Sequence, residues 1–338
     1  MKRKLALLVA GVMVVGMFAG CGSSASSDSS SDSSSESTDE STDDSSSDSA
    51  AADGDVVLGY SCVDMNNTFQ TYLVAAAQDK AEELGASITV TDAQNDVVKQ
   101  QDQVKALIQQ GVDALIVVIA DSSAAEPVTQ AAQDAGIPLV YVNTLPQGFE
   151  EGSLPDGVHY VGSYEHDAGV MQGEMIGEAI GSGKVAILQG GLEYEATYNR
   201  SQGNKDEFEE NYPDIEVVTE ETANWQRDKA IDVVNNWLTA YDDLAAICAN
   251  NDEMALGAIQ ALQAAGKDIP VVGVDATVDG CAAVKDGSML GTVFQDSVGQ
   301  GGGAVEIAVN WVKGEEPESD ITWVPYVKVT ADNVDDYM

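Results

Sequence analysis

Short apolar runs alternate with segments of helical period along most of this chain. Runs at 56–61, 87–91, 114–120 and 139–143 have the length and composition of buried strands. Segments 69–84, 97–110 and 124–135 lie between them, carry apolar residues at amphipathic helix spacing, and are followed by Gly85, Gly111 and Gly136 as helix ends. Because strands that alternate with helices form parallel sheets, the pattern predicts an α/β fold with helices on both faces of the sheet.

The alternation restarts after a loop with Gly and Pro at 147–157, which predicts a second lobe. Its strand candidates are 159–162, 185–189, 216–220, 245–249, 271–274 and 291–294. Its helix candidates are 168–180, 198–211, 226–240, 253–265, 280–285 and 299–312. A last run at 322–327 contains Pro325, which cannot donate a backbone hydrogen bond, so we expect an edge strand or a crossing there.

Polar side chains follow three of the apolar runs near the C-terminal end of the chain. Asn251, Asp275 and Gln295 each stand at the end of a predicted strand, where ligands of open α/β sheets bind. Amides and a carboxylate together accept and donate hydrogen bonds, which suits a neutral polyhydroxyl compound. Of the adjacent Asn251 and Asp252, we expect Asp252 to cap the next helix and Asn251 to face the ligand. These residues indicate a sugar site.

The N-terminus has the pattern of an export signal. A basic start at 1–4 precedes a short apolar stretch at 5–18 and the small residues Ala19 and Gly20. The sequence Phe18-Ala19-Gly20-Cys21 resembles the bacterial lipoprotein signal, in which the Cys becomes the lipidated first residue of the mature protein. The resemblance implies that residues 1–20 are removed and that Cys21 carries a lipid anchor. The alternative is a plain secretory signal with an incidental Cys.

Residues 21–54 are almost entirely Ser, Asp, Glu, Thr and Ala, with no Lys or Arg. Such a segment has nothing large and apolar to bury, so we expect a disordered linker that holds the domain away from a membrane surface. The formal net charge of the whole chain is −42. That charge disfavours nucleic acid as a partner, because phosphates are bound by Lys and Arg.

No pattern for a metal, a cofactor or catalysis stands out in the sequence. Cys62, Cys248 and Cys281 include no C-x-x-C spacing and no Cys/His cluster, so we expect no zinc site, no nucleophile and no disulfide framework. Glu193 and Glu195 are the nearest to a carboxylate pair, but they stand in a Gly-flanked loop where solvated charge is the default. We expect a binding protein without a cofactor rather than an enzyme.

The chain resembles the type I sugar-binding proteins of bacterial ABC importers, particularly the galactose, ribose and inositol binders. The resemblance spans essentially all of 56–334. Its most specific pieces are 250–258 (NNDEMALGA), 273–276 (GVDA), 222–225 (TANW), 141–143 (YVN) and 65–69 (MNNTF), in the expected order and spacing.

The resemblance implies a fold of two doubly wound, parallel-sheet α/β lobes joined by a hinge of three crossings, with the ligand between them. By that resemblance the N-terminal lobe comprises 55–162 plus 296–321, and the C-terminal lobe comprises 163–295 plus 322–338. Closure of the hinge around the ligand is the expected motion.

Eight positions match ligand contacts of the family. Asn67 and Asn143 match first-lobe residues that hydrogen-bond sugar hydroxyls, and Arg200 matches a cleft Arg that donates to sugar oxygens. The remaining matches are two aromatic residues that pack on the faces of the ring and three polar contacts of the second lobe and hinge: Phe69, Trp225, Asn251, Asp275 and Gln295. Two aromatic walls and a belt of planar polar groups fit the two surfaces of a sugar or cyclitol.

Departures from the family patterns bear on the identity of the ligand. Asn67 stands where galactose and glucose binders carry Asp, Gln295 stands where they carry Asn, and their calcium loop is missing at 181–184. Asn143-Thr144 replaces the Asp-Arg pair of ribose binders. The segments 141–143 and 323–326 look closest to inositol-type binders.

The resulting hypothesis is a lipid-anchored, monomeric solute-binding protein on the outer face of the cytoplasmic membrane. It would bind a monosaccharide or inositol and hand it to ABC permease subunits. A sensor that presents the ligand to a receptor kinase or chemoreceptor would use the same cleft. A secreted glycosidase would need two opposed carboxylates, and the predicted site offers one convincing acid, Asp275.

Overall fold

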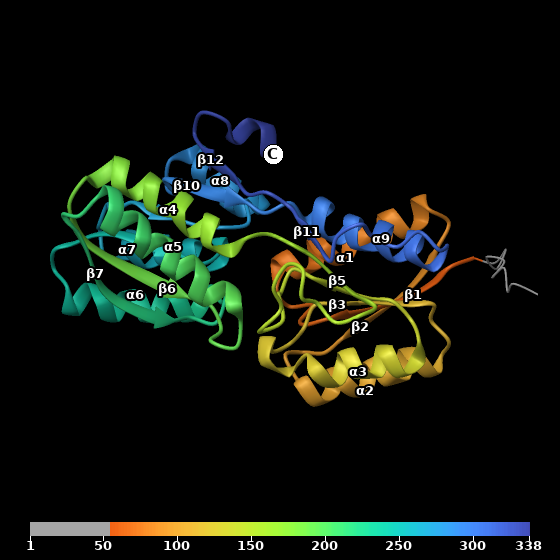
Figure 1. Cartoon of the computed structure of the whole chain (residues 1–338). Helices are drawn as coiled ribbons and strands as arrows, with labels where there is room; N and C mark the ends of the chain where they lie inside the picture. The colour runs from red at the N-terminus through yellow and green to blue at the C-terminus, as the bar shows by residue number, and fades with distance from the viewer. Residues whose placement is uncertain (1–54) are drawn as a thin grey trace, which may run out of the picture. The chain divides into compact units, whose positions relative to one another are not determined.

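The computed structural model describes residues 55–338, which form two six-stranded sheets with their helices (Figure 1). The first sheet has the order β11-β5-β4-β3-β1-β2, and all of its strand pairs are parallel. Its strands are β1 (Val57–Cys62), β2 (Ser87–Asp92), β3 (Ala114–Val117), β4 (Leu139–Val142), β5 (Val158–Gly162) and β11 (Ile321–Trp323).

The second sheet has the order β12-β10-β9-β8-β6-β7, and it is parallel except for the antiparallel edge strand β12. Its strands are β6 (Gly183–Gln189), β7 (Ile215–Thr222), β8 (Leu244–Ala249), β9 (Val271–Val272), β10 (Gly291–Phe294) and β12 (Val327–Thr330). The strand order reverses at β1/β3 in the first sheet and at β6/β8 in the second. The loops at the carboxyl ends of the strands beside these switch points are where such sheets bind ligands.

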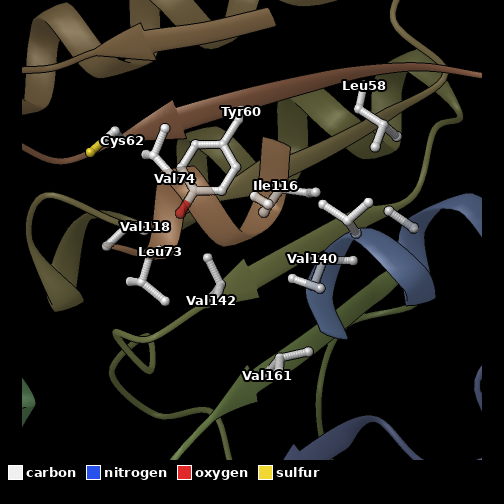
Figure 2. Packing of buried hydrophobic residues seen from close by; sticks show 14 of the residues in the cluster. Leu58, Tyr60, Cys62, Leu73, Val74, Ile116, Val118, Val140, Val142 and Val161 are labelled. Atoms are coloured by element: carbon white, nitrogen blue, oxygen red, sulfur yellow. The ribbon is translucent and has the colours of Figure 1, made fainter. Parts of the chain in front are cut away.

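Helices cover both faces of the first sheet, which Figure 1 shows with α1 and α9 on one side and α2 and α3 on the other. These helices are α1 (Thr68–Glu83), α2 (Val97–Gln109), α3 (Glu126–Ala135) and α9 (Gly303–Val312). Alternate residues along each strand belong to two hydrophobic cores, one on each face of the sheet. Leu58, Tyr60 and Cys62 of β1 point to the α1/α9 side (Figure 2). Leu115 and Val117 of β3 point to the α2/α3 side.

The second sheet is built in the same way. One face packs on α4 (Glu165–Ile180) and α5 (Glu195–Asn211). The other face packs on α6 (Arg227–Ala240), α7 (Asp252–Ala264) and α8 (Val278–Asp286). A strand buried on both faces needs a nearly continuous apolar run, which explains why β8 reads Leu-Ala-Ala-Ile-Cys-Ala.

The chain passes three times between the two sheets. The first crossing leads from β5 through Ser163 and Tyr164 into α4. The second leads from β10 through Gln295 into a π-helical turn, η2 (Val298–Gly302), and then α9, both of which pack on α1 of the first lobe. The third lies between β11 and β12 and contains Pro325. The predicted fold class of two doubly wound lobes with a three-crossing hinge is confirmed.

The observed elements follow the predicted ones closely and differ mainly at their ends. The run at 322–327, predicted as an edge strand or a crossing, contains the end of the edge strand β11, the third crossing with Pro325 and the first residue of the edge strand β12, so the lobe border predicted at 321–322 falls inside β11. The helix predicted from 124 begins as a separate 3-10 turn, η1 (Ser122–Ala124), because Pro127 favours a new helix start two residues later.

Three of the predictions concern residues outside the described part of the chain: the export signal, Cys21 and the linker at 21–54. Within residues 55–338, no helix is both long enough and apolar enough to cross a membrane. Cys62, Cys248 and Cys281 are buried and free, as expected for small apolar residues of the cores.

Candidate ligand-binding cleft

A cavity of about 220 Å³ lies between the carboxyl-end loops of the two sheets. All eight residues predicted to contact the ligand line it, although they come from both lobes and from the second crossing. The complete lining is Val63, Asp64, Asn66, Asn67, Phe69, Gln70, Asn95, Asn143, Thr144, Glu165, Tyr194, Ala196, Arg200, Asn224, Trp225, Gln226, Asn251, Asp275 and Gln295.

Asn67 lines the cavity and also caps a helix. Its side-chain oxygen caps α1 by accepting hydrogen bonds from the backbone N–H groups of Phe69 (3.0 Å) and Gln70 (3.3 Å). The amide nitrogen Nδ2 therefore carries what Asn67 can offer to a ligand, which is two donated hydrogen bonds.

Asn143 is held by two glutamines that sequence reasoning missed. Gln70 Nε2 donates to Asn143 Oδ1 at 2.9 Å, and Asn143 Nδ2 donates to Gln300 Oε1 at 3.2 Å. Gln300 in turn donates to Ser163 Oγ in the first crossing. The Oε1 atom of Gln70, a lining residue only 5% exposed, has no partner among the described residues. The position of Gln70 in the helical turn after Asn67 could have predicted its place at the site. Gln300 lies in a π-helical turn, which no sequence motif predicts.

Two aromatic residues of the predicted set, Phe69 and Trp225, line the cavity from different lobes. Phe69 is buried in the first turn of α1, and Trp225 lies in the loop after β7 with a φ of 63°. The Trp225 ring makes an edge contact with Tyr194, at 6.0 Å between ring centroids. The ring also fills the space over Gly190, where an added Cβ would lie 2.0 Å from it. Gly190 is therefore required for the position of this wall.

Asn251 takes the capping role that was predicted for Asp252, whereas Asp252 takes no part in the cavity lining. Asn251 caps α7 by accepting from the backbone N–H of Met254 at 3.0 Å, while it also lines the cavity. Asp252 is fully buried below the cavity, where it accepts from the Thr292 hydroxyl (2.6 Å) and from the backbone and hydroxyl of Thr277. The prediction that Asp252 caps the helix was wrong, because the threonines of two neighbouring strand ends recruit its carboxylate.

Asp275 offers an unused carboxylate to the cavity. The residue follows β9 and is 6% exposed, and its carboxylate accepts no hydrogen bond from the described residues. Burial, and next the charge of Asp252, raise the pKa of Asp275 well above its usual range, against the opposing effect of Arg200. A ligand that donates hydroxyl hydrogens to Asp275 would relieve this unfavourable burial.

Arg200 is engaged mainly with the protein itself. Its Nε donates to Glu165 at 2.6 Å, one terminal nitrogen donates to the carbonyl oxygen of Asn250 at 2.7 Å, and the other donates to Gln295 (3.3 Å) and Tyr326 (3.0 Å). Four of the five N–H groups of the guanidinium are thus used, which leaves one for a ligand. Glu165, Gln295 and Tyr326 each belong to or adjoin a different crossing, so Arg200 ties the three hinge strands together.

The charged groups that line the cavity are one cation, Arg200, and the three carboxyl groups of Asp64, Glu165 and Asp275. Arg200 is balanced by Glu165. The Asp64 carboxylate accepts from the amides of Asn66 (2.9 Å) and Asn95 (2.6 Å). No group of three or more His, Cys, Asp or Glu gathers as a metal site within 55–338.

Unusual backbone conformations concentrate at the cavity. Seven non-glycine residues of the described part have a positive φ, and five of them line it: Asn95, Asn143, Asn224, Trp225 and Asp275. Such conformations cost of order 1–3 kcal/mol each and persist only where the surrounding structure enforces them. Their clustering marks this cavity as a functional site.

The two lobes touch each other around the cavity. Thr68 Oγ1 donates to Glu253 at 3.1 Å, and the Tyr194 hydroxyl donates to Asn95 at 2.8 Å. The backbone N–H of Ser122 donates to the carbonyl oxygen of Glu193 at 3.2 Å. These bonds cross from one lobe to the other, so closing the hinge and enclosing a ligand are linked.

Two hinged α/β lobes with a partly open polar cavity between them define the class of the molecule, and the sequence comparison agrees. The profile of the periplasmic binding protein domain family matches residues 58–316, and the chain belongs to this family. Its relatives include a putative rhizopine-binding protein of Rhizobium meliloti, 41% identical over 286 residues that cover 83% of this chain and 92% of the relative. The ribose import binding protein of Bacillus subtilis is 35% identical, over 79% of this chain and 85% of the relative.

Solved structures show the same kinship. An ABC transporter solute binding protein from Bacillus halodurans C-125 with bound myo-inositol is 37% identical, with a TM-score of 0.78 over 84% of this chain and 97% of that chain. The myo-inositol binding protein of Caulobacter, also with bound myo-inositol, is 27% identical and has a TM-score of 0.78 over 85% and 97%. The resemblance to type I sugar-binding proteins is thereby confirmed.

Proposed function

We propose that this protein is an extracytoplasmic solute-binding lipoprotein that captures a neutral ring polyol, a cyclitol or monosaccharide, and delivers it to an ABC permease. One observation carries the proposal. The eight predicted contact residues line one cavity, in which Asp275 has a free carboxyl group and the Arg200 charge is already balanced.

The size and chemistry of the cavity favour a small uncharged ring. Its volume of about 220 Å³ is below the roughly 300–1,000 Å³ of pockets for drug-sized ligands. Phe69 and Trp225 offer apolar surfaces for ring C–H groups, while Asn67, Asn143 and Asp275 offer donors and acceptors for hydroxyls. A phosphorylated or carboxylated ligand would bring a negative charge to Asp275 without a free cation to meet it.

Among ring polyols we favour a cyclitol of the inositol type. The two solved relatives named above hold myo-inositol, and the contact set here is made of amides where galactose and ribose binders carry additional charged groups. Those charged groups are replaced by Asn67 and Asn143 in this chain.

Anchoring and delivery complete the proposal. Lipidation of Cys21 and a flexible segment at 21–54 would hold a monomeric domain at the outer face of the cytoplasmic membrane. The two lobes, with the border predicted at 321–322 moved to the end of β11 at Trp323, would close on the ligand and present a joint surface to the permease. Catalysis is not proposed. Of the other acids of the cavity lining, Asp64 uses both carboxylate oxygens within the protein, and Glu165 pairs with Arg200 through Oε2 while its Oε1 has no partner among the described residues.

Isothermal titration calorimetry with myo-inositol, ribose, xylitol and galactose tests the binding function. We expect micromolar affinity for myo-inositol, about −8 kcal/mol, and weaker binding of the others. Asp275→Asn should weaken myo-inositol binding about 10- to 100-fold, because hydrogen bonds to charged groups contribute about 1.5–3 kcal/mol. The matched control Asp332→Asn changes an exposed carboxylate and should leave the affinity unchanged. Absence of heat with every polyol, or equal effects of the two substitutions, would refute the proposal.

A further inference from the structure

A second hollow, of about 800 Å³, lies beside the hinge and is separate from the cleft except for one shared wall residue, Tyr194. It runs between the first-lobe loop 145–151 and the second-lobe segment 192–199. Ser122 lines it and joins the lobes there: its backbone N–H donates to the Glu193 carbonyl oxygen, and its hydroxyl accepts from the Glu195 backbone N–H at 3.2 Å. We call this hollow the hinge groove.

The hinge groove has a one-sided charge. Five carboxyl groups line it, and no Lys, Arg or His does so within the described part of the chain: the five are Asp121, Glu150, Glu151, Glu193 and Glu195. One oxygen of the Glu195 carboxyl group is buried without a hydrogen-bond partner among the described residues. A hollow lined by one sign of charge focuses the field and concentrates counter-ions.

The aromatic residues of the hinge groove are unusual in being exposed. The three aromatic side chains most exposed in 55–338 all line it: Tyr164 (56%), Tyr198 (54%) and Trp323 (39%). The rings of Tyr164 and Trp323 stand nearly perpendicular, at 85° with centroids 5.8 Å apart, and form an open aromatic corner. The Trp323 indole N–H also points to the Glu151 carboxylate, at 3.4 Å.

Aromatic faces together with carboxylates match one ligand chemistry. An organic cation is attracted to ring faces by the π quadrupole and to carboxylates by charge, and quaternary ammonium groups are recognised by aromatic corners of this kind. Anions are repelled by the carboxylates of Asp121, Glu150, Glu151 and Glu193, whereas burial raises the pKa of Glu195 to about 8, so its carboxyl group adds little charge at neutral pH. A neutral polyol would gain nothing from the uncompensated charge.

We propose that the hinge groove is a second binding site, for a small organic cation with a quaternary ammonium group. Because the occupant contacts both lobes at their Ser122–Glu193 junction, it binds the closed arrangement best. Occupancy then increases the affinity of the cleft for its ligand, and the cleft ligand increases the affinity of the groove to the same extent. Tyr194, which lines both spaces, connects the two sites.

Nuclear magnetic resonance of the four Trp indole N–H groups tests the site directly. The Trp323 signal reports on the hinge groove and the Trp225 signal on the cleft, while Trp237 and Trp311 lie outside both. The four signals are assigned with Trp→Phe variants. Choline is the probe, and 3,3-dimethylbutan-1-ol, which has the same shape without the charge, is its control. Choline should shift the Trp323 signal with a saturable curve, while the neutral analogue should shift it at least about tenfold less effectively.

Substitutions separate the aromatic and electrostatic parts. Tyr164→Leu and the pair Glu150→Gln with Glu151→Gln should each weaken the choline response of Trp323. Trp311→Phe, which lies outside both sites, should leave it unchanged. Tyr164, Glu150 and Glu151 are exposed and Trp311 is half-buried, and thermal unfolding of each variant verifies its fold.

Three results would overturn the proposal: a linear choline response, an equal response to the neutral analogue, or a response to an arginine-containing tripeptide without one to choline. The last would identify a peptide-binding surface instead. The choline titration is performed without any cleft ligand, so its outcome does not depend on the proposed function. Repeating it with saturating myo-inositol tests the coupling, for which a higher choline affinity is expected.

Discussion

At the scale of single residues, the polar side chains of the cleft serve the fold and the ligand at once. Asn67 and Asn251 cap helices with their oxygens, and Arg200 spends four of its five N–H groups on the hinge. These side chains therefore stabilise the fold as well as being placed to contact a ligand. The two roles can be separated by substitutions that keep one of them.

Asn67→Asp is such a substitution. Asp caps a helix as well as Asn does, so the free energy of unfolding should change by less than about 0.5 kcal/mol. The Nδ2 donor is lost, however, so polyol affinity should fall about tenfold or more. Chemical denaturation and calorimetry measure the two quantities. A large loss of stability with unchanged affinity would contradict this assignment.

Glu195 gives a prediction for the pH dependence of stability. Burial, and next the charge of Glu165, raise its pKa from 4.5 to about 8. Between these values the folded protein keeps a proton that the unfolded chain releases, so the free energy of unfolding falls as the pH rises, by up to about 1.4 kcal/mol per pH unit. Below pH 4.5 both states are protonated and this effect vanishes.

Glu195→Gln removes that titration. Its stability relative to the wild type should increase by more than about 1 kcal/mol from pH 5 to pH 8, as measured by urea denaturation. Glu178→Gln, at an exposed position of α4, is the control and should run parallel to the wild type. A parallel curve for Glu195→Gln as well would show that the raised pKa of Glu195 is wrong.

At the scale of elements, the sequence patterns predicted the strands and helices because each core face is fed by alternate apolar residues. The patterns failed where the local signal was mixed. The 322–327 run joins the end of one edge strand to the start of another, and Pro325 lies between the two hydrogen-bond ladders. Gln300 escaped notice because a π-helical turn has no sequence signature, and the burial of Asp252 away from the helix cap depends on threonines more than 20 residues away. The hinge groove was not predicted, since its walls come from loops that no periodicity describes.

The β6 to α5 connection gives a prediction at this scale. Gly190→Ala would place a Cβ 2.0 Å from the Trp225 ring and displace this wall of the cleft. Polyol affinity should fall about tenfold or more, with a change in Trp fluorescence. In Gly303→Ala the nearest atom to the new Cβ is 3.8 Å away, so this control should bind normally. Normal binding by Gly190→Ala would show that the Trp225 ring is not needed where it lies.

At the scale of the whole molecule, Arg200 joins all three crossings to α5. Arg200→Lys keeps the charge but cannot reach Asn250, Gln295 and Tyr326 together, so the free energy of unfolding should fall by about 2–4 kcal/mol. Arg227→Lys is the matched control. Arg227 is 38% exposed and pairs with Glu253 and Asp279, so its replacement should cost less than about 1 kcal/mol. Equal effects in thermal denaturation would mean that Arg200 is not a hinge tie.

The central claim is that the cleft encloses a neutral ring polyol. A crystal structure of the protein grown with myo-inositol tests it most directly. We predict a ring bounded by Phe69 and Trp225, with hydroxyls within hydrogen-bond distance of Asp275, of the free amide nitrogen of Asn67 and of the Asn143 amide N–H that Gln300 leaves unused. A cleft that holds only water at saturating myo-inositol, or a polyol bound elsewhere on the molecule, would contradict it.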